Sequence, residues 1–295
     1  MFTRQILWAV VPWALFLSSC SSERTELEKT HRGGCILTCP AAETPANPYR
    51  QSDVVATNEY KPFTKKLSVY GITLLGRDNV SDAFMRQVAK TVKEMFPQGP
   101  AINRALQQKT LKNLYRYRAT IPIFKGEPDL ASEQQWQMYH EMKRHNSVCD
   151  IIMEGVPGQT MEVVEHILHH VTDVGLHYTF PDEWGITKTS KLYHAMQEAI
   201  ARNCYVSEYE PADDEVEERI ALQEFGYWLI TTAWDIQQRY GPEVNTEWTV
   251  RNSSELKAKL PLSYQLYEQT VRKIMAPPSL STLDEFSNME IVKTP

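Results

Sequence analysis

The chain has 295 residues, of which 42% are apolar, and its 37 acidic and 31 basic side chains give a formal net charge of −6. This length suits one large domain or two small ones, and the apolar content supplies a substantial core, which excludes a disordered or fibrous protein. Because a mildly acidic chain lacks the basic surface that phosphate groups require, nucleic acid is excluded as a partner.

Residues 1–19 have the features of an export signal. Arg4 gives a weakly positive start, residues 6–17 are mostly apolar, and Leu17-Ser-Ser-Cys20 is typical of a cleavage site. The apolar run is shorter than the ~20 residues that a bilayer needs, which disfavours a membrane span. The LSSC motif resembles the bacterial lipobox, which implies a lipoprotein signal peptide over residues 1–19, lipidation of Cys20 and a lipid anchor at the bacterial cell envelope. An ordinary signal peptide that ends near Ser19 is the alternative.

Residues 20–66 are polar and rich in Thr, Pro and Asn, which predicts a flexible tether. Beyond Cys20 the chain has four cysteines, an even number that in an exported protein is compatible with two disulfides of unassigned pairing: Cys35, Cys39, Cys149 and Cys204. A zinc half-site at Cys35 and Cys39 is the weaker interpretation, because no second half lies nearby.

Residues 67–275 predict one α+β domain, followed by an irregular tail over residues 276–295. The alternation of apolar residues favours strands at residues 67–75, 119–124 and 148–153. Helical spacing favours helices at residues 82–96 (with Ser81 as N-cap), 101–115, 132–145, 190–203, 214–240 and 253–275, the last interrupted near Pro261. Residues 177–185 are predicted to form an aromatic loop.

Residues 160–175, TMEVVEHILHHVTDVG, predict a helix with two unlike faces, for which Thr160 is the expected N-cap. One face is apolar and consists of Met161, Val164, Ile167, Leu168, Val171 and Val174. The other has three histidines and three carboxylates: Glu162, Glu165, His166, His169, His170 and Asp173. Such a density of imidazole and carboxylate groups favours a metal site, most simply for zinc. A solvated polar face is the alternative.

Side chains four residues apart on a helix share a face, so a metal ion can be held by Glu165 with His169 or by His166 with His170. The first pair lies near the centre of the polar face, whereas His170 lies at its border, which favours Glu165 and His169 as ligands. The zinc-peptidase pattern H-E-x-x-H is absent. In the favoured pair, His166 occupies the place of the general-base glutamate.

Glu224, 55 residues beyond His169 (224 − 169), is the best candidate for a third ligand. Its helical neighbours are mostly apolar, and a half-buried carboxylate requires a cation or hydrogen bonds. A salt bridge with an Arg or Lys is the alternative. Tyr227 is a candidate donor to a developing oxyanion. Asp173 and His177 are candidates for orienting His169, or they shape the loop that follows.

The order of these motifs, VEHILHHVTDVG, then EFGYWL, then EW followed by LPLSYQLYE, resembles zincin metallopeptidases with a glutamate ligand, and more closely an uncharacterised group of secreted zincin-like proteins. The resemblance covers about residues 67–275. It implies a small mixed sheet, a metal-bearing helix and a mostly helical C-terminal half. In that group a pattern like E-E-x-L-H-x-x-T carries the ligands, which places them on Glu165 and His169. His166 departs from the pattern where the second glutamate would stand.

These patterns together predict an exported, lipid-anchored, zinc-dependent hydrolase of the metallopeptidase type, with a peptide or protein as substrate. His166 would then accept the proton from the attacking water. The alternative is a catalytically inactive, zincin-like binding or structural lipoprotein of the cell envelope, because the base glutamate is missing.

Overall fold

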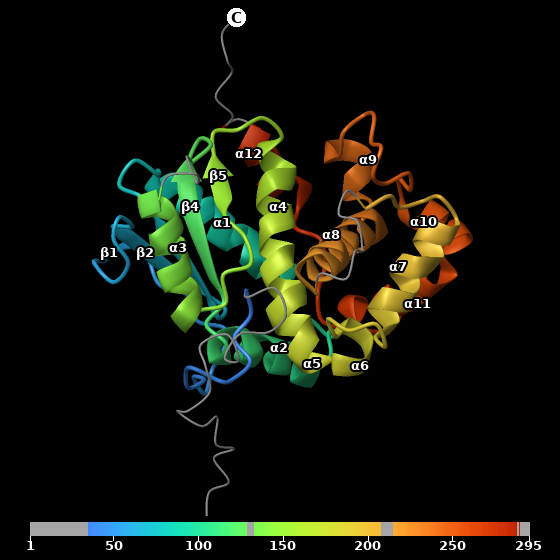
Figure 1. The fold of residues 1–295 in the computed structure, drawn as a ribbon, viewed down its shortest axis with the longest axis horizontal. Helices are drawn as coiled ribbons and strands as arrows, with labels where there is room; N and C mark the ends of the chain where they lie inside the picture. The colour runs from blue at the N-terminus through green and yellow to red at the C-terminus, as the bar shows by residue number, and fades with distance from the viewer. Residues whose placement is uncertain (1–34, 129–132, 208–214, 288, 290–295) are drawn as a thin grey trace, which may run out of the picture.

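A five-stranded mixed sheet forms one side of the molecule, and a group of helices forms the other (Figure 1). The computed structural model describes residues 35–128, 133–207, 215–287 and 289, so the expected signal peptide and Cys20 lie outside the described residues. The strands follow in spatial order: β1 (Val55–Ala56), β2 (Lys65–Val69), β3 (Ile72–Gly76), β4 (Thr120–Lys125) and β5 (Ile152–Glu154). The first three pair antiparallel, and β3, β4 and β5 pair parallel. The expected α+β class with a small mixed sheet is therefore confirmed.

The single strand expected at residues 67–75 is wrong, because the segment is a tight hairpin of β2 and β3. Val69 pairs with Ile72, and the two residues between them, Tyr70 and Gly71, both have positive φ (50° and 95°). Such a two-residue turn matches the twist of antiparallel strands. A Cβ atom on Gly71 would lie 2.8 Å from the Leu111 carbonyl oxygen, so a glycine is required at this close approach.

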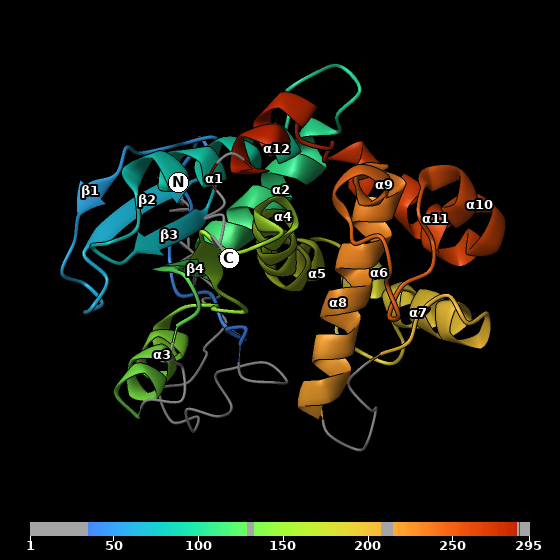
Figure 2. The ribbon, with the colours of Figure 1, turned by 90° about the horizontal axis from the view of Figure 1, so that it is seen from above.

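Helices cover both faces of the sheet (Figure 2). The larger core contains α1 (Asp82–Met95) and α2 (Arg104–Arg116), and a smaller core lies under α3 (Glu133–His145). Neighbouring residues on β3 contribute to different cores: Leu74 belongs to the larger core and Leu75 to the smaller. Ser81 caps α1 as predicted, because its hydroxyl accepts a hydrogen bond from the Phe84 N–H at 3.1 Å.

The two-faced helix begins one residue before Thr160 and changes its winding near its end. It consists of α4 (Gln159–His170) and the π-helical segment η3 (Val171–Leu176). Thr160 is not the N-cap as predicted: Gly158 holds that position with φ 72°, and the Thr160 hydroxyl donates to the Leu283 carbonyl at 3.1 Å. The expected aromatic loop is instead two short helices, α5 (His177–Thr179) and α6 (Pro181–Trp184).

The C-terminal half is helical: α7 (Lys191–Ala201), α8 (Glu215–Ala233), α9 (Ile236–Tyr240), α10 (Ser253–Lys259), α11 (Pro261–Gln269), the 3-10 turn η4 (Val271–Lys273) and α12 (Leu280–Ser287). The helix expected over residues 214–240 is broken at Asp235, which has φ 61°. The expected interruption near Pro261 is present, between α10 and α11. In the described parts of the chain, no helix is both long and apolar enough to cross a membrane.

The packed part of the chain extends beyond residues 67–275, the predicted domain, at both ends. Ile36 and Phe63 are fully buried, so the described part of the predicted tether contributes side chains to the core, although most of residues 40–66 are exposed. At the other end, α12 places Leu283 and Phe286 in the larger core, where an irregular tail was expected. Within the described chain, the packed body therefore extends from residue 35 to residue 287.

Candidate metal centre

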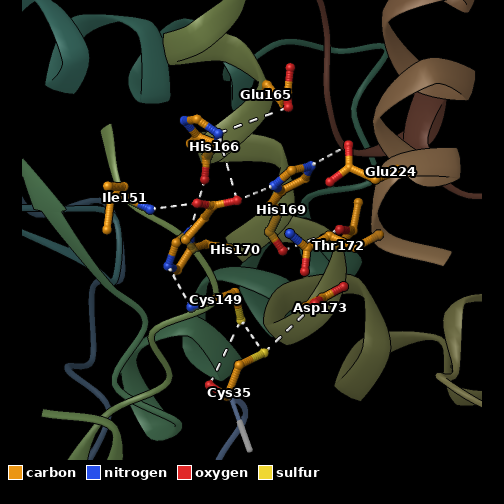
Figure 3. Close-up of polar contacts among 12 residues, drawn as sticks. Cys35, Cys149, Ile151, Glu165, His166, His169, His170, Thr172, Asp173 and Glu224 are labelled. Atoms are coloured by element: carbon orange, nitrogen blue, oxygen red, sulfur yellow. Dashed lines mark hydrogen bonds and ion pairs between the residues drawn. The ribbon is translucent and has the colours of Figure 1, made fainter. Parts of the chain in front are cut away.

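Three side chains from two helices meet beside the larger core. Glu165 and His169 lie one turn apart on α4, and Glu224 lies on α8, which packs against α4. One ligand atom from each of the three lies within 4.8 Å of the others. His169 Nε2 is 3.6 Å from Glu224 Oε2 (Figure 3). The three residues expected as metal ligands are thus brought together, and the ion partner of Glu224 in the described chain is His169 instead of an Arg or Lys.

His169 is fully buried and is held by Asp150, a residue that lies two positions before β5. Asp150 Oδ2 is 2.9 Å from His169 Nδ1. When Nδ1 carries the proton and donates it to this carboxylate, Nε2 presents its lone pair toward Glu224. His169 Nε2 has no partner within hydrogen-bond distance, and its nearest carboxylate oxygen, Glu224 Oε2, lies at 3.6 Å. A buried polar atom without a partner is rare in folded proteins, and here it faces two carboxylates.

Carboxylates from three segments of the chain determine the electrostatics around His169. Burial by itself lowers the pKa of His169, but the carboxylates of Glu224 and Asp150 outweigh burial and raise this pKa well above its usual value. Burial also raises the pKa of Glu165 to about 7, with Glu224 and Asp150 adding to the effect and the two histidines opposing it. A divalent cation among these groups would compensate the carboxylates directly and leave the imidazole neutral.

The donor set fits zinc. Two carboxylates and one imidazole are ligands that catalytic zinc sites use, and three protein ligands leave a fourth position open. Bonds of ~2.0–2.2 Å to a tetrahedral ion would place the ligand atoms about 3.4 Å apart, and His169 Nε2 and Glu224 Oε2, at 3.6 Å, already lie close to that separation. Rotation of the two carboxylate side chains could supply the remaining adjustment, because Glu165 and Glu224 are only partly buried.

Tyr227 lies against the same cluster. Its ring centre is 6.2 Å from that of His169, and the Glu165 carboxylate lies near its hydroxyl. Burial, together with Glu165, raises the pKa of Tyr227 well above its usual value, so the phenol keeps its proton. Its hydroxyl is therefore a possible hydrogen-bond donor at the edge of the site.

His166 has an environment unlike that of a general base. Its Nδ1 lies 3.2 Å from Glu162 Oε1, and its Nε2 lies 3.6 Å from Asp150 Oδ2 and 3.9 Å from Glu165 Oε1. Burial lowers the pKa of His166, but Asp150, Glu162 and Glu165 outweigh it and raise the pKa to about 9. Without a bound ion, these carboxylates favour the protonated imidazole, which has no lone pair to accept a proton.

The alternative ligand pair, His166 with His170, is not assembled. His170 Nδ1 donates to the His166 carbonyl oxygen at 2.8 Å, and its Nε2 accepts the Cys149 N–H at 3.1 Å. Burial lowers the pKa of His170 to about 4, so the ring is neutral. Both nitrogens are used inside the core, and the prediction of His170 as an alternative ligand is wrong.

The two residues expected to orient His169, Asp173 and His177, have partners elsewhere. Asp173 Oδ2 accepts from the Arg219 guanidinium at 3.0 Å, and both residues are buried. His177 Nδ1 accepts the Ile186 N–H at 3.3 Å. Asp150 takes this role instead. In the sequence, Asp150 is the single charged residue of the predicted strand at residues 148–153, which is otherwise apolar.

No protein-family model matches the chain, and comparisons with curated proteins and with solved structures find no match either. An argument about function therefore depends on the geometry of Glu165, His169 and Glu224 and on the groups that surround them.

Proposed function

We propose that this protein binds a zinc ion through Glu165, His169 and Glu224 and that it is a zinc-dependent hydrolase of the metallopeptidase type. The observation that carries the proposal is the buried His169 Nε2, which lacks a hydrogen-bond partner and faces carboxylates from two different helices. The order of elements agrees with the resemblance to zincins: a small mixed sheet precedes the helix with two ligands, and a later helix supplies a glutamate.

Two of the surrounding side chains have a part in this function. When bound, zinc would polarise a substrate carbonyl and lower the pKa of a coordinated water. Asp150 holds His169 in the tautomer that exposes Nε2, and the Tyr227 hydroxyl lies near Glu165. This hydroxyl could donate to an oxyanion at an amide carbonyl.

A second candidate function is a zincin-like protein without turnover that binds or organises other components of the cell envelope. The specific observation in its favour is His166, whose two nitrogens both face carboxylates and which stands where a zinc peptidase has its base. A site with this side chain can hold an ion, yet it lacks the group that removes a proton from water.

For both candidates we propose the same location. Signal-peptide removal and lipidation at Cys20 would anchor the protein to a membrane of the bacterial cell envelope, with a peptide or protein as substrate or ligand. Cys20→Ser should then release the protein from the membrane fraction. Recovery of the variant in that fraction at the level of the wild type would contradict the anchor.

Zinc content tests the metal site. Purified wild-type protein should contain stoichiometric zinc by elemental mass spectrometry, and His169→Gln and Glu224→Gln should lose it while circular dichroism stays unchanged. Two matched controls on the exposed surface, His194→Gln and Glu243→Gln, should keep the ion. A wild-type protein that contains no metal after incubation with zinc, or a His169→Gln variant that still binds it, would overturn the proposal.

The two candidate functions are separated by His166→Glu, which restores the base found in zinc peptidases at this place. The zinc-loaded wild type should cleave a library of fluorogenic peptides if it is a hydrolase, and the activity should disappear with His169→Gln. If the wild type is inert but His166→Glu gains cleavage, the inactive zincin-like protein is the correct reading. If both are inert in the zinc-loaded state, the hydrolase function is wrong.

A further inference from the structure

A second group of reactive side chains lies beneath the metal centre and has no part in it. Cys35 and Cys149 are buried thiols, and their Sγ atoms are 2.9 Å apart (Figure 3). They are 114 residues apart in the chain. The third free cysteine in the described residues, Cys204, lies beside α7 with its Sγ near the Arg202 carbonyl oxygen.

The backbone holds the two cysteines together. The Val148 N–H donates to the Cys35 carbonyl at 3.0 Å, and the Leu37 N–H donates to the Ser147 hydroxyl at 3.1 Å. The segment at residues 35–37 therefore lies directly along the segment that precedes β5. A disulfide of about 2.0 Å would require the sulfur atoms to approach by less than an ångström, which small rotations of the two side chains can supply.

We propose that Cys35 and Cys149 form an internal disulfide bond when the protein folds in the presence of a disulfide oxidant. The bond would fasten the first described segment to the residues beside Asp150 and His170. This inference does not depend on the proposed function.

The electrostatic surroundings make Cys35 the attacking residue. Burial raises the pKa of its thiol, but the hydrogen bond between the two thiols and the positive charges of Arg219 and Lys143 outweigh burial and lower the pKa below its usual value. Burial and the neighbouring Cys35 raise the pKa of Cys149 well above its usual value. The thiolate is the nucleophile in thiol–disulfide exchange, so the first step belongs to Cys35.

The exchange is balanced in two steps. The Cys35 thiolate attacks one sulfur of the oxidant disulfide, forms a mixed disulfide and releases the other half as a thiol. Cys149 then loses its proton and attacks Cys35 Sγ, which forms the internal bond and releases the second half as a thiol. Two electrons and two protons pass from the cysteines to the oxidant.

Zinc held by Cys35, Cys149 and Asp173 is the competing interpretation, because these three side chains also converge. Asp173 is already paired with Arg219 at 3.0 Å, so its charge is compensated. Zinc–thiolate bonds of about 2.3 Å in a tetrahedral site would hold the sulfurs about 3.8 Å apart, farther than they are here. The geometry therefore favours the covalent bond.

The thiols are buried, with 1% and 8% of the residue surface exposed, so the bond should form during folding more readily than afterwards. The test uses the full mature chain, refolded in a buffer of oxidised and reduced glutathione, then denatured and alkylated without reduction. The linked peptides that contain Cys35 and Cys149 should together be lighter by two hydrogen atoms than the two reduced peptides, and Cys35 and Cys149 should escape alkylation. Fragmentation of the linked peptides should place the bond on Cys35 and not on Cys39.

Three variants complete the experiment. Cys35→Ser and Cys149→Ser should lose the linkage, and Cys204→Ser should keep it. The oxidised wild type should unfold at a higher urea concentration than the reduced wild type, because the bond closes a loop of 114 residues in the unfolded chain. Alkylation of both thiols after refolding, or a linkage to Cys39 or Cys204, would overturn the proposal. So would zinc that is retained in His169→Gln and lost when Cys35 is also replaced by Ser.

Discussion

His169 Nδ1 and Asp150 Oδ2 lie 2.9 Å apart, and this contact joins α4 to the segment that leads into β5. The contact decides which imidazole nitrogen faces the carboxylates of the candidate metal centre. The Asp150 carboxylate also lies near His166, whose Nε2 is 3.6 Å from the same oxygen. One carboxylate therefore positions two histidines of the site.

Asp150→Asn should weaken zinc binding by about 10–100-fold, because it removes the charge that orients His169 and increases its basicity. Competition with a chromophoric chelator measures the affinity. Asp53→Asn is the control, since it makes the same substitution at an aspartate that pairs with Arg86 on the surface. An unchanged zinc affinity in Asp150→Asn would remove Asp150 from the site.

Asp173→Asn should destabilise the protein by about 3–5 kcal/mol without loss of zinc, because the variant leaves the buried charge of Arg219 uncompensated. Urea unfolding measures the free energy of unfolding. The double variant Asp173→Leu/Arg219→Met should recover much of the loss, since both charges leave the core together. If Asp173→Asn lowered zinc affinity and kept wild-type stability, Asp173 would belong to the metal centre as its position in the sequence suggested.

Gly175→Ala should destabilise the fold by about 1–3 kcal/mol through overpacking. A Cβ atom at this position in η3 would lie 2.9 Å from Thr110 Cγ2 on α2. Thr110→Ser removes that methyl group and keeps the hydroxyl that donates to the Leu106 carbonyl, so the double variant should regain stability in thermal unfolding. Gly226→Ala is the control, because its nearest contact, at 3.4 Å to the Trp184 ring, is ordinary.

Glu94→Gln should lower stability at neutral pH, and the difference from the wild type should disappear in acid. Burial raises the pKa of Glu94, but hydrogen bonds from Ser279 and Thr282 outweigh it and hold this pKa below its usual value. The Glu94 carboxylate therefore contributes to stability at pH values above its pKa in the unfolded chain, about 4.3. This contribution is lost as the pH falls through the lower pKa of the folded state.

After allowance for solvent screening, the loss at pH 7 should be about 1 kcal/mol. Urea unfolding of both proteins at neutral pH and in acid measures it, with the exposed Glu243→Gln as the reference. A difference that stayed constant down to the acid end would show that the Glu94 charge has no role.

Helices were predictable because their signals are local. The apolar spacing of residues 82–96 and the Ser81 cap define α1 with few errors. The hairpin at Tyr70 and Gly71 was missed because this dipeptide resembles a strand residue followed by a breaker, and not one of the Asn-Gly or Asp-Gly turns. Residues 35–66 and α12 were missed because their polar composition conceals a few side chains, such as Ile36 and Phe286, that reach the core.

Like the fold, the candidate site was predictable where its signals are local. Glu165 and His169 follow from helical spacing, and Glu224 follows from the difficulty of burying an uncompensated carboxylate. The roles of Asp150, Asp173 and His170 depend on contacts between distant segments, with His169, Arg219 and Cys149 respectively. The sequence pattern carries no information on such contacts. The sequence analysis therefore gave Asp173 and His170 other roles and gave Asp150 none.

The π-helical winding of η3 amounts to one surplus residue in a turn, placed directly after the His-rich stretch. A π-helical turn accommodates such a residue by widening, so deleting one residue between Val171 and Leu176 would restore regular winding and leave the flanking helical segments close to their present register. Glu165 and His169 would not move, and the loss would fall on the widened turn that packs against α2. The widened turn beyond the ligands is thus a place where the chain can lose a residue while α4 keeps its packing against α8.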